Sequence, residues 1–159
     1  MPTTAAQAVV TTGTAVKSLL QIKASATKPM QIVEWGISFD GSAAATPIKV
    51  ELLETDVAAT VTASAAADIC KLDAEALAGG DPTTNLIPVG TTSTGYTASG
   101  EGSITAVRMF DVQLIAPTNQ YVKQFPLGLE PVVQISKFAR IRVTAGAAVN
   151  AYCYMVVRV

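Results

Sequence analysis

Residues 31–40 read QIVEWGISFD, and this stretch decides the fold class of the chain. Val33, Trp35, Ile37 and Phe39 stand at every second position, with polar or small residues between them. A period of two is typical of a β-strand that buries one face and exposes the other. The sequence therefore predicts a strand whose apolar row from Val33 to Phe39 lies in the interior.

The same alternation recurs on both sides of this strand. It is found in residues 19–23, 48–52 and 138–144. For the last two stretches, the residues predicted to face inward are Ile48, Val50, Leu52, Ala139, Ile141 and Val143. Those predicted to face outward are Lys49, Glu51, Arg140, Arg142 and Thr144.

A further strand predicted within residues 103–116 changes the parity of its apolar row. Val107 and Met109 occupy one phase of the alternation, and Phe110, Val112 and Leu114 occupy the other. A one-residue β-bulge near Met109 would reconcile the two phases.

Several short strands separated by turn clusters, with almost no helix, predict an all-β sandwich or barrel. The only helix-like piece is residues 68–77, and the uncharged residues 82–100 are expected to form a long surface loop. Residues 1–16 lack charge and periodicity. They are expected to form an arm, either ordered against a neighbour or without function, and residues 17–159 a single β-sandwich domain.

The composition excludes several common catalytic mechanisms. The 159 residues contain no histidine, so neither a Ser-His-Asp triad nor an imidazole metal site can form. The clustered acids Glu51, Glu54 and Asp56 are expected to lie at a solvated strand edge. We therefore expect no enzyme activity and no catalytic, metal-binding or cofactor-binding residues. The net charge of −1 gives no reason to expect a nucleic-acid or membrane partner.

The stretch 149–159 is apolar on both faces, which predicts a second layer over its outer face. That layer is either the long loop of the chain or another subunit. If residues 138–144 and 149–159 form a hairpin, Arg142 lies opposite Tyr152 and Arg140 opposite Tyr154. The residues predicted to contact other copies or a partner protein are Tyr152, Tyr154, Val156, Arg140, Arg142, Tyr121, Thr3 and Thr4.

Four stretches together resemble a known family. They are VEWGISFDG (33–41), TGYTASGEGSITA (94–106), PTNQYVKQFPLGLEP (117–131) and FARIRVTAGAAVNAYCYMVV (138–157). In their order along the chain and in their residue types, they resemble small tailed-bacteriophage virion proteins that decorate or cement capsids. The resemblance implies a jelly-roll-like β-sandwich in which the last two strands lie in facing sheets. It also implies a homotrimer that bridges major capsid protein subunits at three-fold positions on the capsid exterior, after synthesis in the host cytoplasm.

An alternative from another class stays open. A β-sandwich from a phage tail or fibre could bind carbohydrate or a receptor through Trp35, Tyr96 or Tyr121. A hydrolase built on paired carboxylates is a third hypothesis.

Overall fold

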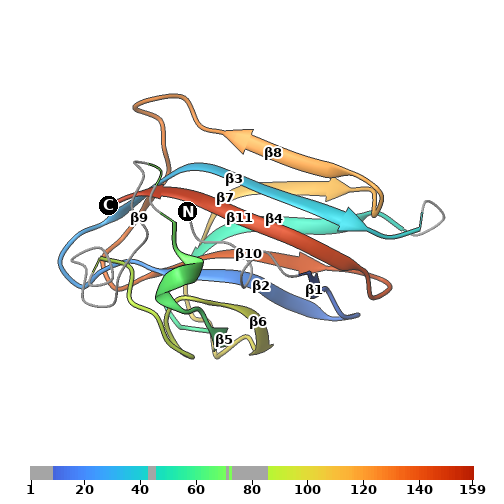
Figure 1. Cartoon of the computed structure of the whole chain (residues 1–159), viewed down its shortest axis with the longest axis horizontal. Coiled ribbons are helices and arrows are strands. Elements are labelled where there is room, and N and C mark those ends of the chain that lie inside the picture. The colour runs from blue at the N-terminus through green and yellow to red at the C-terminus, as the bar shows by residue number, and fades with distance from the viewer. Residues whose placement is uncertain (1–8, 43–45, 71, 73–85) are drawn as a thin grey trace.

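Two antiparallel β-sheets pack face to face in the computed structural model, which describes residues 9–42, 46–70, 72 and 86–159 (Figure 1). The predicted all-β sandwich is confirmed. The second of the two sheets has six strands, and one sheet is curled as a half-barrel.

The first sheet runs in the order β1-β11-β3-β8, and β9 also pairs with β3. Its strands are β1 (Val10–Thr11), β3 (Met30–Asp40), β8 (Gln120–Gln124), β9 (Val132–Val133) and β11 (Asn150–Arg158).

The second sheet runs in the order β5-β6-β2-β10-β4-β7. Its strands are β2 (Val16–Lys23), β4 (Ile48–Thr55), β5 (Thr60–Ala63), β6 (Gly95–Gly100), β7 (Val107–Ile115) and β10 (Phe138–Thr144).

Eight of these strands follow the order of a jelly roll. One layer contains β1-β11-β3-β8 and the other β2-β10-β4-β7, while β5 and β6 extend the second layer beyond β2. Consequently β10 and β11 lie in opposite sheets, as they do in Figure 1. The hairpin pairing of Arg142 with Tyr152 and of Arg140 with Tyr154 does not form.

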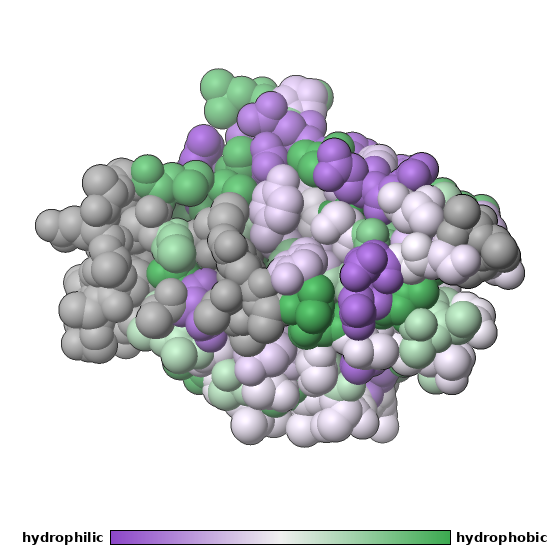
Figure 2. Space-filling model, turned by 45° about the vertical axis from the view of Figure 1, so that its right-hand side comes forward, coloured by the Kyte–Doolittle hydropathy of each residue, from purple (hydrophilic) through white to green (hydrophobic). Residues whose placement is uncertain are grey.

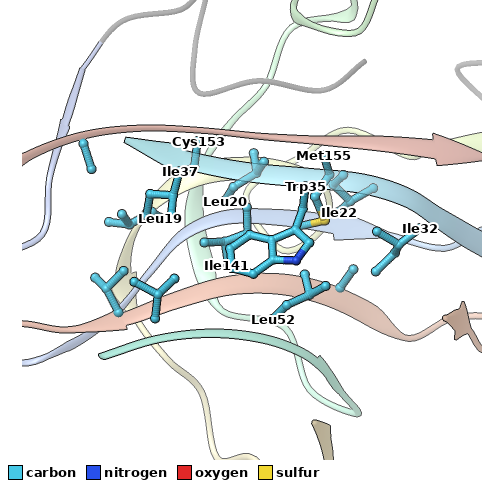
Figure 3. Close-up of a cluster of buried hydrophobic side chains, with 14 of the residues drawn as sticks. Leu19, Leu20, Ile22, Ile32, Trp35, Ile37, Leu52, Ile141, Cys153 and Met155 are labelled. Carbon is cyan, nitrogen blue, oxygen red and sulfur yellow. The ribbon is translucent and has the colours of Figure 1, made fainter. Parts of the chain in front are cut away.

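The core lies between the sheets and centres on Trp35, which has no exposed surface. Figure 3 shows the indole ring among side chains from both layers, including Ile22 and Ile141 of the second sheet and Met155 of the first. All three of these side chains are fully buried. The predicted burial of Trp35, Ile37 and Phe39 is confirmed.

The predicted burial of Val33 is wrong, because β3 contains a bulge. Val156 pairs with Glu34 and Val157 pairs with Ile32, so Val33 is the extra residue. The bulge shifts the alternation by one position, and Ile32 is buried where Val33 was expected.

The predicted bulge in β7 is confirmed, next to Met109. Leu52 pairs with Asp111 and Leu53 with Met109, which leaves Phe110 as the extra residue. The bulge brings the apolar residues on its two sides onto one face of the strand. That face points away from the core, as described below.

The terminal arm and the long loop were predicted too broadly. Val10 is buried in the core and pairs with Ala151, so the expectation that residues 1–16 stand apart from the sandwich is wrong for β1. Residues 95–100 form β6 rather than part of a surface loop. Of the predicted helix, the structure describes only residues 68–70 and 72, next to a short 3-10 helix η2 (Ala66–Asp68).

Candidate association surfaces

The outer face of the first sheet carries the tyrosines that the sequence predicted to lie at an interface. Tyr152 is 44 % exposed and pairs with Ser38 across β3. Tyr154 and Val156 lie on the same face and are half-buried. Only Tyr152 of the three therefore presents a large free surface to a partner.

Tyr154 lies against its own sheet because its neighbour across the strand is Gly36. A Cβ atom at Gly36 would lie 2.5 Å from the Tyr154 ring, so only glycine leaves room for it. The Tyr154 hydroxyl donates a hydrogen bond to Glu34 Oε1 at 2.6 Å. Burial and this contact with Glu34 raise the pKa of Tyr154 to about 12. Tyr154 is thus held by its own chain.

Arg140 is fully buried on the outer face of the second sheet, which argues against its predicted role at an interface. Its guanidinium donates to the Glu101 carboxylate at 3.2 Å, to the Glu101 carbonyl at 3.1 Å and to the Val57 carbonyl. Ser18 donates to the same carboxylate from its amide at 2.5 Å and from its hydroxyl at 2.7 Å. Burial lowers the pKa of Arg140, and the nearby Glu101 carboxylate opposes that shift.

A neighbouring glutamine extends this polar cluster. The Gln21 side chain accepts from the amide of Ala59 at 2.8 Å and donates to the carbonyl of Ser93 at 2.6 Å. Residues 57–59, Ser93 and Glu101 lie outside the strands of this sheet and contact these two side chains of β2 and β10. We term these residues the cover. The cover is not the second layer predicted over residues 149–159, because those residues form β11 of the first sheet. For β11 the two alternatives, the long loop or another subunit, stay open.

Glu51 is buried, so the prediction that it faces solvent is wrong. Lys49 lies 2.7 Å from its carboxylate, and Arg142 donates to it from Nε at 3.0 Å. Burial alone would raise the pKa of Glu51, but the hydrogen bonds from Lys49 and Arg142 outweigh it and lower the pKa. Arg142 thus serves an internal ion pair.

The other two clustered acids also have partners within the chain. Glu54 accepts from Arg108 at 2.9 Å and from the amide of Gln134 at 2.7 Å. Asp56 accepts from the hydroxyl and amide of Thr105 and from the next amide, and these contacts lower its pKa to about 2. In the part of the chain that the structure describes, no three acids or cysteines gather as metal ligands.

Tyr121 closes the side of the sandwich where β7 and β8 meet. Its ring centroid lies 5.3 Å from that of Trp35, and its hydroxyl donates to Asp111 at 3.1 Å. Lys123 of β8 pairs with the same carboxylate at 3.4 Å. Burial and then Asp111 raise the pKa of Tyr121. Tyr121 is therefore engaged in the fold, although it is partly exposed.

These positions bear on the carbohydrate alternative and on the remaining predicted residues. Trp35 has no exposed surface, so its ring is not available to stack on a sugar, whereas Tyr96 is half-buried and packs against the core. Thr3 and Thr4 lie outside the described residues. No helix among the described residues is long and apolar enough to cross a membrane.

An exposed apolar row lies on β7, on the single face that the bulge near Met109 was predicted to create. Val107, Met109 and Val112 are 44 to 49 % exposed, and Leu114 is 76 % exposed. Among the described strands, β7 pairs only with β4, so its other edge is unpaired. We call these four side chains and this edge the β7 row. The alternation in the sequence predicted that these side chains share one face of the strand. No neighbouring residue indicated that this face points away from the core.

Comparison with family models, with curated proteins and with solved structures finds no match to this chain. The two-sheet sandwich that the resemblance to capsid decoration proteins implied is the observed fold. The function implied by that resemblance remains a prediction.

Proposed function

We propose that the protein is a structural component of a bacteriophage virion. In this role it decorates the capsid exterior and stabilises the shell by bridging major capsid protein subunits, as a trimer at three-fold positions. The trimer and the three-fold position rest on the resemblance of the four sequence stretches. The jelly-roll order of the strands is consistent with that resemblance.

The β7 row is the observation that carries an association role. Exposed edge strands with apolar side chains favour pairing with other chains, and proteins normally protect them with charges, prolines or bulges. In β7 the four outward side chains are all apolar, and they stay exposed although the strand contains the bulge at Phe110 and the exposed Arg108. Such a surface is costly on a solitary soluble protein but suits a subunit that is buried in an assembly. We assign the β7 row to contacts between copies of the chain.

The arrangement of the charges supports a structural role over catalysis. The acids nearest one another, Glu51, Glu54 and Asp56, each bind separate groups of the chain. Glu54 and Asp56 line one shallow pocket, but Glu54 is bound to Arg108 and Asp56 to Thr105. Among the aromatic residues discussed above, only Tyr152 is classed as exposed, so it is the ring most accessible to a carbohydrate.

The test adds purified protein to undecorated shells of the phage that encodes it. Imaging should reveal added density over the three-fold positions, and the shells should release their genome at a higher temperature. A ligand that binds only the assembled shell stabilises it by mass action. Confirmed binding without a shift in release temperature would remove the stabilising role. Reproducible micromolar binding on a glycan array, with no binding to shells, would favour the carbohydrate alternative.

A further inference from the structure

The chain between β8 and β9 forms a tight turn with an inverted burial pattern. Leu127 and Leu129 are 83 % and 73 % exposed, whereas the side chain of Glu130 is only 3 % exposed. Leucine is among the residues most often buried in proteins, and glutamate is rarely buried without a partner. This turn therefore holds its charge inside and presents its apolar side chains to the outside.

Hydrogen bonds fix the shape of the turn. The amide of Leu129 donates to the carbonyl of Pro126 at 2.9 Å, and Gly128 has the positive φ of +86° that a type II turn requires at its third position. The buried Glu130 carboxylate accepts from the amide of Gly128 at 2.6 Å and lies 3.6 Å from the Arg158 guanidinium. The two leucines are thus held in place by backbone contacts.

Both ends of the turn are attached to β3 at adjacent residues. The amide of Phe125 donates to the carbonyl of Val33, and the amide of Ile32 donates to the carbonyl of Pro131, each at 2.9 Å. Because β8 and β9 both pair with β3, residues 125–131 leave the sheet and return to the same place. The turn projects from the top of the molecule in Figure 1, and Figure 2 shows hydrophobic surface at the top of this projection.

Two cations beside the turn form ion pairs with acids of the chain, and Lys28 is a further cation that lines a shallow pocket with Arg158. Lys123 lies 5.2 Å from the ring of Phe125 and forms its ion pair with Asp111, while Arg158 pairs with Glu130. A turn that inserts into an anionic membrane is normally accompanied by lysines and arginines that are free to bind headgroups. The charges here instead favour a protein surface as the partner.

We propose that Leu127 and Leu129 anchor the protein in an apolar socket on the surface of its partner protein. The proposal rests on the proposed function, under which that partner is the major capsid protein. A rigid turn loses little conformational freedom on docking, which favours binding. In a trimer, three such turns bind together, so a modest single contact is sufficient.

The test compares two variants of the full chain for binding to undecorated shells by co-sedimentation. One variant carries Leu127→Ser together with Leu129→Ser. The matched control carries Leu72→Ser, because Leu72 is 74 % exposed elsewhere on the molecule. We expect the double variant to lose about tenfold or more in affinity, as anchor residues do when truncated, and the control to bind like the wild type. Both should keep the wild-type melting temperature and oligomeric state.

A third variant tests the shape of the turn with both leucines intact. A Cβ at Gly128 would meet no atom within 4 Å, so Gly128→Ala adds only backbone strain from the positive φ. We expect it to weaken shell binding too. Wild-type binding by the double variant would overturn the anchor and leave the proposed function standing. Failure of the wild-type protein to bind shells would overturn both. Wild-type binding to anionic phosphatidylglycerol vesicles that the double variant loses would also overturn the anchor.

Discussion

Trp35 fills the space between the two sheets, and its replacement should reveal how much the core depends on it. We expect Trp35→Ala to lower the free energy of unfolding by about 3–5 kcal/mol, because it removes buried apolar surface and leaves a cavity. Urea unfolding followed by circular dichroism measures the change, with Tyr152→Ala as a surface control. A native tryptophan emission maximum typical of water-exposed indole would contradict the burial.

Tyr154 should make stability depend on pH in the alkaline range. Its pKa is raised from the ordinary 10 to about 12, so the folded protein favours the neutral phenol. The stabilisation is fully present below pH 10 and is lost as the pH rises towards 12. In an absorbance titration of the phenols, Tyr154→Phe should remove a component with a midpoint near 12. Loss of a component near 10 instead would contradict the contact with Glu34.

At the residue scale, alternation in the sequence predicted the buried rows and the bulge in β7, but not the bulge in β3. Val33 is apolar and in phase, and only pairing with β11 reveals it as a bulge. The burial of Arg140 depends on Glu101, which lies 39 residues away in the sequence. Local patterns carry no information about such distant partners, so Arg140 was expected to face outward and to contact a partner.

The cover over the second sheet should be held by the contact between Glu101 and Arg140. Removing the carboxylate with Glu101→Ala leaves a buried guanidinium without its ion pair and Ser18 without its acceptor. We expect a loss of about 3 kcal/mol in the free energy of unfolding. Glu101→Gln keeps an acceptor for Ser18, so it should lower the free energy of unfolding by less than Glu101→Ala. Equal losses in the two variants would show that the charge contributes nothing.

The short strand β1 should contribute measurably to the first sheet. Thr12 is buried, donates its amide to the carbonyl of Val149 at 2.9 Å and accepts from the amide of Val149 at 3.1 Å. We expect Thr12→Ala to cost about 1 kcal/mol, and removal of residues 1–12 to cost more because Val10 leaves the core. An unchanged melting temperature after removal would show that β1 does not stabilise the sheet.

At the scale of elements, β6 was missed because its glycines and threonines are typical of a loop. The structure supplies the reason for one glycine, since a Cβ at Gly95 would lie 2.2 Å from the carbonyl of Thr62. Glycine here permits the close approach of β5. Similarly, the sequence of residues 125–131 did not show that Glu130 would be buried and the leucines exposed.

For the whole molecule, we expect the protein to form a trimer in which the β7 row is buried between copies. Val112→Asp should yield monomers in light scattering, because it places a charge in an apolar contact. The control Val122→Asp alters a side chain of similar exposure on β8 and should leave the trimer intact. A wild-type monomer at micromolar concentration would contradict the proposed assembly. A trimeric Val112→Asp variant that no longer binds shells would place the β7 row against the capsid.

The order of strands could not be derived from the strand patterns themselves, because every main pairing joins segments far apart in the sequence. β2, for example, pairs with β10 across more than a hundred residues. The resemblance to decoration proteins supplied the jelly-roll order that alternation could not. Whether β10 and β11 pair stayed open in the sequence, and the structure places them in facing sheets.

The strand order also determines when the protein can fold during translation. In each sheet the strand between the early ones is made late: β10 lies between β2 and β4, and β11 lies between β1 and β3. The ribosome therefore exposes these earlier strands before their common neighbour exists. Neither sheet can close until residues 138–158 have emerged from the exit tunnel, so the interval before that is when nascent chains are most open to aggregation.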